Sequence, residues 1–463
     1  MKYRIEKDSL GEIKVPAKAL WGAQTQRAVN NFPISGIKMD FPFTKSFVSS
    51  LGLIKDAAAK ANLRLKLLSS KKSKAISKAA KEVWQEKHHN EFPIDVFQTG
   101  SGTSSNMNAN EVIASLATKY AKIKIDPNDD VNMSQSSNDV IPTAIKISAH
   151  MDLTKKLFPK LDELIQIIEK KANSLKGTIK TGRTHLMDAM PIDFEDELKA
   201  WSGQLKSSKE MLNILQKKFL ELPQGGTAVG SGINAHKKFA KYFADEITNL
   251  SGNKYKSVPS RNFYHELSAQ DCSVQLSGEL KNLAVILMKI SNDLRWMNSG
   301  PLTGLSEIEL KALQPGSSIM PGKVNPVIPE AVAMVSADVI GNDVSITVAA
   351  QSGNFQLNVM LPVIAYNLLK SINLLSGAMN ALSKKAIKTF KVNNENLKIS
   401  LSKNPILVTA LNPIIGYEKA AEIAKTAYKE NRPIIDVAAE KTNISKARLE
   451  RLLDPSKLSK GGI

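Results

Sequence analysis

The chain has 463 residues, of which 42% are hydrophobic and 23% charged, so it can bury more than one core and disorder is not expected. A single cysteine, Cys272, excludes an internal disulfide framework, and the charged opening Met1–Asp8 lacks the apolar run of a signal peptide, which indicates a cytoplasmic protein. The formal charge of +19 comes from 63 basic and 44 acidic residues. Because the basic residues are mostly scattered lysines and only 6% of residues are aromatic, this charge favours a solvated surface that attracts a small anion over a nucleic-acid interface.

Two polar segments in the first third of the chain are dense in neutral hydrogen-bond donors. They are Gln98–Asn108, which contains Ser101, Gly102 and Thr103, and Ser134–Asp139, which contains Ser136, Ser137 and Asn138. Hydroxyl and backbone donors suit a dicarboxylate, and a helix that begins there would add to the attraction. The same residues could instead serve only as helix N-caps, so the pattern alone leaves both roles open.

Long helices dominate the middle of the chain. A helix is predicted over Leu153–Ala172, with a kink at Pro159. Apolar residues in steps of three and four, typical of helices in a long bundle, form three stripes. The stripes are Leu157, Leu161, Leu164 and Ile168; Leu276, Leu280, Leu283, Leu287, Ile290, Leu294 and Met297; and Leu368, Ile372, Leu375, Met379 and Leu382.

The segment Gly182–Asp188 places His185, one of six histidines, beside Thr184. A lone histidine is more often a structural hydrogen-bonding group than a catalyst, and a catalytic role becomes stronger if a carboxylate orients the ring. Glu330, at the start of an expected helix after Pro329, is the candidate carboxylate.

Other patterns argue against cofactor, metal and hydrolase sites. Gly230–Ala235 has the GxGxxA spacing of a dinucleotide fingerprint, but no strand precedes it and no βαβ pattern surrounds it. No His/Cys cluster has metal-ligand spacing, and no phosphate-binding loop is present. A Ser-His-Asp hydrolase built on Ser317 and His185 would lack the GxSxG elbow.

The loop Pro315–Pro326 carries the densest set of reactive side chains. Its two glycines and three prolines exclude a regular helix. Ser317, Ser318, Lys323 and Asn325 form a set that can bind a carboxylate and stabilise negative charge developing on it. An activated serine hydroxyl in this loop could also act as a base or nucleophile.

The uncharged run 345–369 raises the question of a membrane span. It contains Gln351, Gly353, Asn354 and Pro362, which a lipid-facing helix tolerates poorly. We therefore expect two buried helical segments that meet at a turn. From about residue 395 the sequence is Lys-rich with shorter helical patterns, which indicates a small separate domain.

Taken together, these segments resemble the fumarase/aspartase superfamily over nearly the whole chain. The loop Ser317–Asn325 matches the signature GSSxMPxKxNP, and Gly22–Arg27 and Leu411–Tyr417 also look like this family. The resemblance implies a mainly α fold in three domains: an N-terminal helical domain with substrate-binding loops (1–138), a central bundle of five long helices that carries the signature loop (139–393), and a small C-terminal helical domain (394–463). It further implies a homotetramer with a twenty-helix core and active sites shared by three subunits.

Two activities compete within the superfamily: the reversible hydration of fumarate to L-malate, a reaction of the citric acid cycle, and the deamination of aspartate by an aspartate ammonia-lyase. Thr99–Thr103, Ser136–Asn138 and Gly322 are similar to the fumarase form, whereas Val327–Glu330 and Asn412–Gly416 look more like aspartase. Because the segments that favour fumarase line the substrate site, the resemblance favours fumarate hydration, without metal or cofactor.

The resemblance also implies the role of each site residue. Ser317 would remove the C3 proton of malate, and His185, oriented by Glu330, would act through a water or directly on the leaving hydroxyl as the acid. The resulting aci-carboxylate needs donors that are stronger in the transition state than in the ground state. The implied substrate-binding residues are Ser101, Gly102, Thr103, Ser136, Ser137, Asn138, Thr184, Ser318, Lys323, Val324 and Asn325.

One departure concerns a second, peripheral anion site, which fumarases build around His-Pro-Asn-Asp. Here the motif reads Asp126, Pro127, Asn128 and Asp129, so a carboxylate stands where an anion would bind and the sequence argues against the site.

Two non-enzyme alternatives are a silent structural protein and a basic nucleic-acid-binding protein. The intact Ser317, His185, Lys323 and Glu330 argue against the first, and only net charge supports the second. We therefore expect no nucleic-acid or membrane partner.

Overall fold

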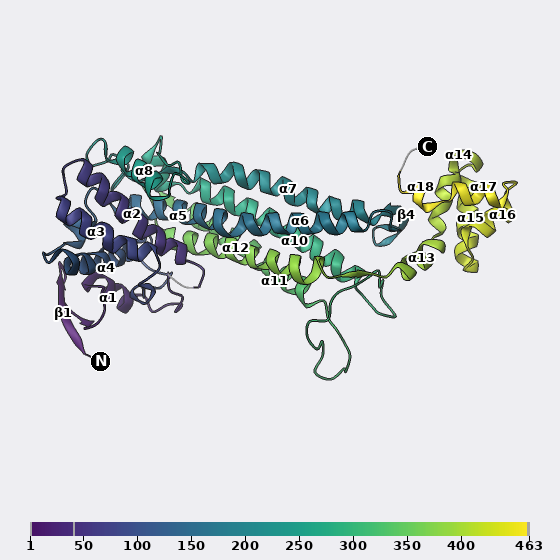
Figure 1. The fold of residues 1–463 in the computed structure, drawn as a ribbon, viewed down its shortest axis with the longest axis horizontal. Helices are drawn as coiled ribbons and strands as arrows, with labels where there is room; N and C mark the ends of the chain where they lie inside the picture. Colours follow the sequence, from purple (N-terminus) through teal and green to yellow (C-terminus); the bar gives the residue numbers. More distant parts are fainter. Residues whose placement is uncertain (1, 40–41, 461–463) are drawn as a thin grey trace. The chain divides into compact units, whose positions relative to one another are not determined.

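A computed structural model describes residues 2–39 and 42–460 and is mainly helical, as the sequence predicts (Figure 1). Met1, the first residue of the charged opening segment, lies outside the described residues. The chain divides into two compact units. Unit 1 comprises Met1–Pro159, Ser208–Ala284 and Val335–Ser376, and unit 2 comprises Lys160–Ser207, Val285–Met334 and Gly377–Ile463.

Helix α2 is the centre of the packing in unit 1. It spans Lys45–Arg64 and packs against α3 (Ser70–Trp84), α5 (Ser137–Asp152) and α8 (Phe239–Leu250), while α3 packs against α4 (Thr103–Ala121) (Figure 1). Alanines and a glycine allow this close approach. At Gly52 an added Cβ would lie 2.7 Å from the backbone nitrogen of Trp84, so only glycine fits where α2 meets α3.

Shorter elements complete unit 1. They are the antiparallel hairpin of β1 (Tyr3–Asp8) and β2 (Gly11–Pro16), α1 (Ala23–Asn31), a 3-10 turn (His89–Glu91), a π-helical turn (Pro127–Val131), the parallel pair β5 (Glu221–Leu222) and β6 (Val258–Pro259), α9 (Phe263–Ser268), and the antiparallel pair β8 (Gly353–Asn354) and β9 (Leu357–Asn358). The N-terminus of α1 is held by the buried Glu111 carboxylate, which accepts the backbone N–H groups of Gly22 (2.9 Å), Gln24 (2.9 Å) and Thr25 (3.1 Å). This contact gives the Gly22–Arg27 motif a structural role, because a carboxylate satisfies the otherwise free amides of a helix start.

Five further long helices are α6 (Phe158–Ser174), α7 (Phe194–Lys218), α10 (Asp271–Met297), α11 (Val327–Ala350) and α12 (Leu361–Ala381). The predicted apolar stripes lie on three of them, α6, α10 and α12, with Leu157 and Leu382 in the adjoining π-helical turns. All sixteen stripe residues are buried, which confirms the three stripes. Within unit 1, Lys281 Nζ lies 2.6 Å from Asp343 Oδ2 and joins α10 to α11, and Ser208 Oγ donates to Glu279 Oε1 (2.6 Å) and joins α7 to α10.

The helix predicted over Leu153–Ala172 begins elsewhere. Helix α5 already covers Ser137–Asp152, a π-helical turn follows over Leu153–Leu157, and α6 begins at Phe158. The predicted start at Leu153 is therefore wrong, because the polar residues of α5 are also helical. The irregular turn lies directly before Pro159, whose missing N–H removes one helical hydrogen bond at the predicted kink.

The uncharged run 345–369 forms two helices that meet at a turn, as expected. Helix α11 ends at Ala350, β8 and β9 form the turn, and α12 begins at Leu361. The prediction that both segments are buried holds for most of α12, whereas only 33% of the most apolar window of α11 is buried. Among the described residues, α11 is the one helix long and apolar enough, by length and composition, to cross a membrane.

Unit 2 contains two small sheets and the C-terminal helices. Strands β3 (Ile179–Thr184) and β4 (Met187–Asp193) form a hairpin, and β7 (Ile308–Glu309) pairs antiparallel with β10 (Lys391–Val392). The C-terminal elements follow a π-helical turn (Leu382–Ile387) and are α13 (Asn394–Ser402), a 3-10 segment (Pro405–Leu411), α14 (Asn412–Ile415), α15 (Tyr417–Glu430), α16 (Ile434–Lys441), α17 (Lys446–Leu452) and α18 (Pro455–Leu458). These helices share a hydrophobic core that includes Leu411, Ile423, Val437 and Leu449. The division into three domains at residues 138 and 393 stays a prediction.

Candidate active site

The signature loop of unit 2 holds Ser317 by backbone contacts. Ser317 Oγ accepts the backbone N–H groups of Ile319 (3.2 Å) and Met320 (3.0 Å). The neck of the loop is closed where Gly316 N donates to Lys323 O (2.8 Å) and Asn325 Nδ2 donates to Gly316 O (2.7 Å). Two amide donors aimed at one hydroxyl oxygen stabilise negative charge on it, so this loop can support a serine alkoxide.

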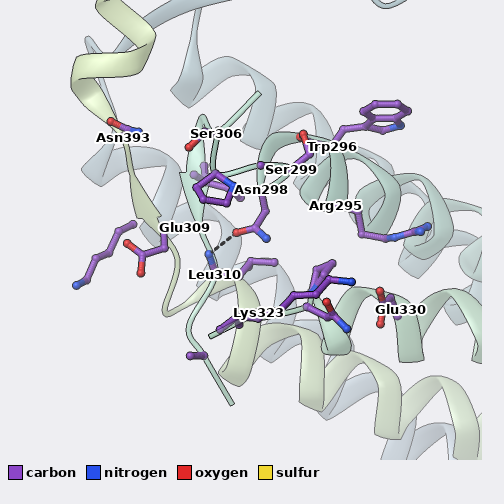
Figure 2. A pocket seen from close by; sticks show the side chains of 18 of the residues that line it. Arg295, Trp296, Asn298, Ser299, Ser306, Glu309, Leu310, Lys323, Glu330 and Asn393 are labelled. Carbon is purple, nitrogen blue, oxygen red and sulfur yellow. Dashed lines mark hydrogen bonds between the residues drawn. The ribbon is translucent and has the colours of Figure 1, made fainter. Parts of the chain in front are cut away.

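A cavity of about 1050 Å³ in unit 2 lies beside the end of this loop, lined by Lys323, Val324, Asn325 and Glu330 among others. Figure 2 shows Lys323, Arg295 and Glu330 around the same space. Three cationic residues (Arg295, Lys323 and Lys391) and two acidic residues (Glu309 and Glu330) line it, so its charge favours an anion. Ser317, Ser318 and His185 are not among the described residues that line it.

His185 lies at the turn of the hairpin β3–β4. His185 and Leu186 both have positive φ, 56° and 61°, which is the conformation of a two-residue hairpin turn. Thr184 and His185 are exposed. In the part of the chain that the structure describes, no hydrogen bond or ion pair joins His185 to Glu330, although both belong to unit 2. Geometry within one chain therefore does not bring these two predicted partners together.

A buried ion network holds the base of this hairpin. Lys180 Nζ lies 2.9 Å from Glu197 Oε2 and 2.7 Å from Glu307 Oε2, and Arg183 Nη1 lies 2.7 Å from Glu307 Oε1. The side chains of Lys180 and Glu307 are 2% and 3% exposed. The network thus fixes the strand that ends at Thr184 and supports the turn that carries His185.

The donor-rich segments of unit 1 lie at the beginnings of two helices that pack together, α4 and α5. Ser101 Oγ and Thr103 Oγ1 are 2.8 Å apart, and Gly102, with φ 72°, starts α4. Ser136 caps α5 in a capping box with Asp139. Asn138 Nδ2 donates to Ala228 O (2.8 Å). The N-cap role is therefore confirmed for Ser136, and the binding of a carboxylate by these hydroxyls and helix N-termini stays a prediction.

Gly100, next to Ser101, packs directly on another segment of unit 1. A Cβ at this position would lie 1.8 Å from the carbonyl oxygen of Val359, and Leu361 N donates to Gly100 O (3.0 Å). We expect Gly100→Ala to lower the free energy of unfolding by about 1–3 kcal/mol, because the backbone must shift. Thermal unfolding of the variant measures this. Gly278→Ala is the control, since nothing lies within 4 Å of its Cβ position, and an equal loss in both variants would contradict the clash.

In the segment that stands in place of the second anion motif, the Asp126 carboxylate occupies two backbone amides. Asp126 Oδ1 accepts the backbone N–H groups of Asn128 (2.8 Å) and Asp129 (3.0 Å) at the start of the turn Pro127–Val131. Because Asp126 occupies these two amides, they do not point freely at an external anion. Asp126, Pro127 and Asn128 line a second cavity of about 830 Å³ in unit 1.

Sequence reasoning missed a buried lysine and a buried aspartate in unit 1. Lys55 and Asp139 are both 0% exposed. Burial lowers the pKa of Lys55 to about 7, although the charge of Asp139 acts in the opposite direction. Burial raises the pKa of Asp139 to about 6, against the backbone donors at Ser136, Gly225 and Thr227 and the charge of Lys55. The one sequence signal was a lysine within the apolar run of α2.

The described residues contain no group of three or more His, Cys, Asp or Glu side chains arranged to hold a metal ion.

Comparison with known proteins gives consistent results over the whole chain. Residues 11–341 match the Lyase family model, and residues 407–460 match the model described as Fumarase C C-terminus. The chain is 57% identical over 460 residues to "Fumarate hydratase class II 2" of Pseudomonas aeruginosa, covering 99% of both chains. It is 56% identical to "Fumarate hydratase class II" of Xylella fastidiosa over 462 residues, covering 100% of this chain and 96% of the relative. A crystal structure of recombinant class II fumarase from Schistosoma mansoni aligns with a TM-score of 0.95 and 36% identity, covering 99% of both chains.

Proposed function

Since the chain belongs to the family of the class II fumarate hydratases, we propose that it catalyses the reversible hydration of fumarate to L-malate. The names of the relatives favour this reaction over the deamination of aspartate. The observation that carries the proposal is the pair of backbone amides aimed at Ser317 Oγ in the signature loop.

Ser317 is the proposed base. A serine hydroxyl is a weak base unless its alkoxide is stabilised, and the amides of Ile319 and Met320 supply two donors at that oxygen. In the direction from malate, Ser317 removes the proton at C3. The electron pair moves into the adjacent carboxylate, which becomes an aci form with two negative oxygens.

Donors for this carboxylate come from the same loop and from the cavity beside it. Lys323 supplies a positive charge. Asn325 Nδ2 donates to the carbonyl oxygen of Gly316, the residue before Ser317, and so keeps the segment of Lys323 close to that of Ser317. Val324 lines the same cavity, and Ser318 adds a hydroxyl next to the base.

His185 is the proposed acid. It protonates the hydroxyl that leaves C2 as water, a step for which an imidazole is a common proton donor. Glu330 is the proposed carboxylate that orients it, across subunits, since no hydrogen bond or ion pair joins the two in the described part of one chain. Ser101, Gly102, Thr103, Ser136, Ser137 and Asn138 of unit 1, with Thr184, hold the substrate carboxylates.

The proposed assembly is a homotetramer built on α11, with sites drawn from three subunits. Met334, Val344 and Val348 are 68%, 60% and 50% exposed, and their spacing places them on one side of this helix. An exposed apolar helix face can mark an interaction surface. A second copy of the chain is the proposed partner of this face.

We expect the protein in solution to have four times the mass of one chain, and Val344→Glu to convert it to smaller, inactive species. A charge buried at an apolar interface costs several kcal/mol, on the order of 3 or more. Light scattering coupled to size exclusion measures the mass. Tyr428→Glu, at an 80% exposed position of α15, is the control, and a fully tetrameric V344E variant would contradict the role of α11.

The reaction is tested by incubating the protein with L-malate and, separately, with L-aspartate in the presence of EDTA, while fumarate absorbance is recorded in the ultraviolet. We expect fumarate from malate only, and the same rate without EDTA, because protein side chains alone carry the proposed steps. Fumarate from aspartate alone would replace the proposal with ammonia-lyase activity.

The cytoplasmic location also stays a proposal.

A further inference from the structure

A lysine ammonium is buried beneath the carboxylate-binding loop of unit 1. Lys55 lies in α2 and is 0% exposed, and its Nζ donates to Asn132 Oδ1 (3.0 Å) and Gln135 Oε1 (3.0 Å). Its hydrogen-bond acceptors are two neutral amides, not a carboxylate. Burying an ammonium in this way is costly, whereas an apolar side chain of similar length would pack in the same space. Packing alone therefore does not account for a charge at this position.

The ammonium fixes the direction of a chain of hydrogen bonds. An ammonium only donates, so Asn132 must present Oδ1 to it, and Asn106 must then present Nδ2 to the same oxygen (3.3 Å). Asn106 Nδ2 also donates to Ser137 Oγ (2.9 Å). Because Ser137 Oγ accepts this bond, its own hydrogen is free to donate to a substrate oxygen.

Other contacts hold the loop itself. Asn62, seven residues after Lys55 on α2, donates through Nδ2 to Met133 O (3.0 Å) and accepts from Ser134 Oγ (2.9 Å). Asp139 accepts the backbone N–H groups of Gly225 and Thr227, both at 2.9 Å. The loop is therefore braced independently of Lys55, and the ammonium contributes direction and charge.

We propose that Lys55 is a positioning residue, which through Asn132 and Asn106 turns the Ser137 hydroxyl toward the carboxylate of a bound dicarboxylate. The inference rests on the proposed function, because it takes Ser137 as a ligand of the substrate carboxylate. In this role Lys55 acts through the two amides and not by contact with the substrate.

The test replaces Lys55 by methionine, which keeps the length of the side chain and removes the ammonium. We expect KM for fumarate to rise about ten-fold with kcat within about three-fold of wild type, the effect of losing one well-directed bond to a charged group. Calorimetry with succinate, a dicarboxylate that cannot be hydrated, should show the same ten-fold loss of affinity. In a Ser137→Ala background Lys55→Met should add less than a two-fold change, since its route to the substrate is already cut.

Lys146→Met is the matched control. Lys146 is 5% exposed, lies in α5 and pairs with Glu266 Oε2 at 2.5 Å, away from the chain of amides. It should lose thermal stability as Lys55→Met does, with KM and succinate affinity unchanged. Asn106→Leu is a second variant for the case that Lys55→Met does not fold. Asn106 Oδ1 is buried and has no hydrogen-bond partner among the described residues, so leucine removes the contacts to Asn132 and Ser137, and KM should again rise about ten-fold.

The results separate the inference from the proposed function. If Asn106→Leu and a folded Lys55→Met leave KM and succinate affinity within two-fold of wild type, the inference is wrong and fumarate hydration stands. Additive effects of Lys55→Met and Ser137→Ala would also overturn it. If the wild type does not hydrate fumarate but binds succinate in a Lys55-dependent way, the proposed reaction fails and the positioning role is supported.

Discussion

Replacing Ser317 by alanine is expected to lower kcat for fumarate hydration by roughly 10²–10⁴-fold, the range typical of removing a general base. The hydroxyl is the only group lost, and it is the one at which the amides of Ile319 and Met320 converge. Affinity for succinate should stay within a few-fold of wild type, because the proposed carboxylate ligands remain. Steady-state kinetics and calorimetry measure the two effects separately.

The control for this experiment is Ser174→Ala. Ser174 Oγ also bonds a backbone group, donating to Lys171 O (2.7 Å) at the exposed end of α6, so its removal tests the effect of losing a serine hydroxyl in general. Activity close to wild type is expected. If Ser317→Ala retained most of its kcat, another group would have to remove the C3 proton, and His185 would become the first candidate.

The parts of the structure that depend on neighbours in sequence could be predicted well. The stripe on α10 follows from the helical period, and every member of it is buried. The donors at Ser317 Oγ come from residues two and three positions later, so the composition of the loop already indicated a site for negative charge. Local pattern also predicted the turn between α11 and α12, because glycine and polar residues interrupt the apolar run.

Contacts between distant residues escaped prediction. The acceptors of Lys55 lie 77 and 80 residues further along the chain, so nothing near Lys55 in sequence indicates that its ammonium is satisfied. Glu307 and Lys180 are 127 residues apart, and neither belonged to a recognisable motif.

For helix α11, the sequence correctly predicts an apolar helix but not which part of it is buried within one chain. Its sequence is apolar as a buried helix should be, but a single chain leaves most of its apolar window uncovered, and the proposed tetramer would cover it.

The buried network at the base of the His185 hairpin should be the most sensitive structural position in unit 2. Both backbone polar groups of Glu307 are hydrogen-bonded: Glu307 N donates to Met297 O (2.8 Å), and Asn393 N donates to Glu307 O (2.9 Å). Its carboxylate bridges Lys180 and Arg183 on β3. Glu307→Ala leaves the Lys180 ammonium buried with one partner fewer, which is expected to cost about 3–5 kcal/mol.

Hydrogen exchange measures this loss locally. We expect backbone amides of residues 179–193 to exchange faster in Glu307→Ala, with kcat reduced because His185 lies at the turn of the same hairpin. Glu309→Ala, at an exposed neighbour, is the control for exchange. The double variant Lys180→Met/Glu307→Gln should exchange more slowly than Glu307→Ala, because it removes the buried ammonium that Glu307→Ala leaves with one partner fewer. Unchanged exchange in Glu307→Ala would mean that the hairpin is held by its strand pairing alone, and that the ion network has no part in presenting His185.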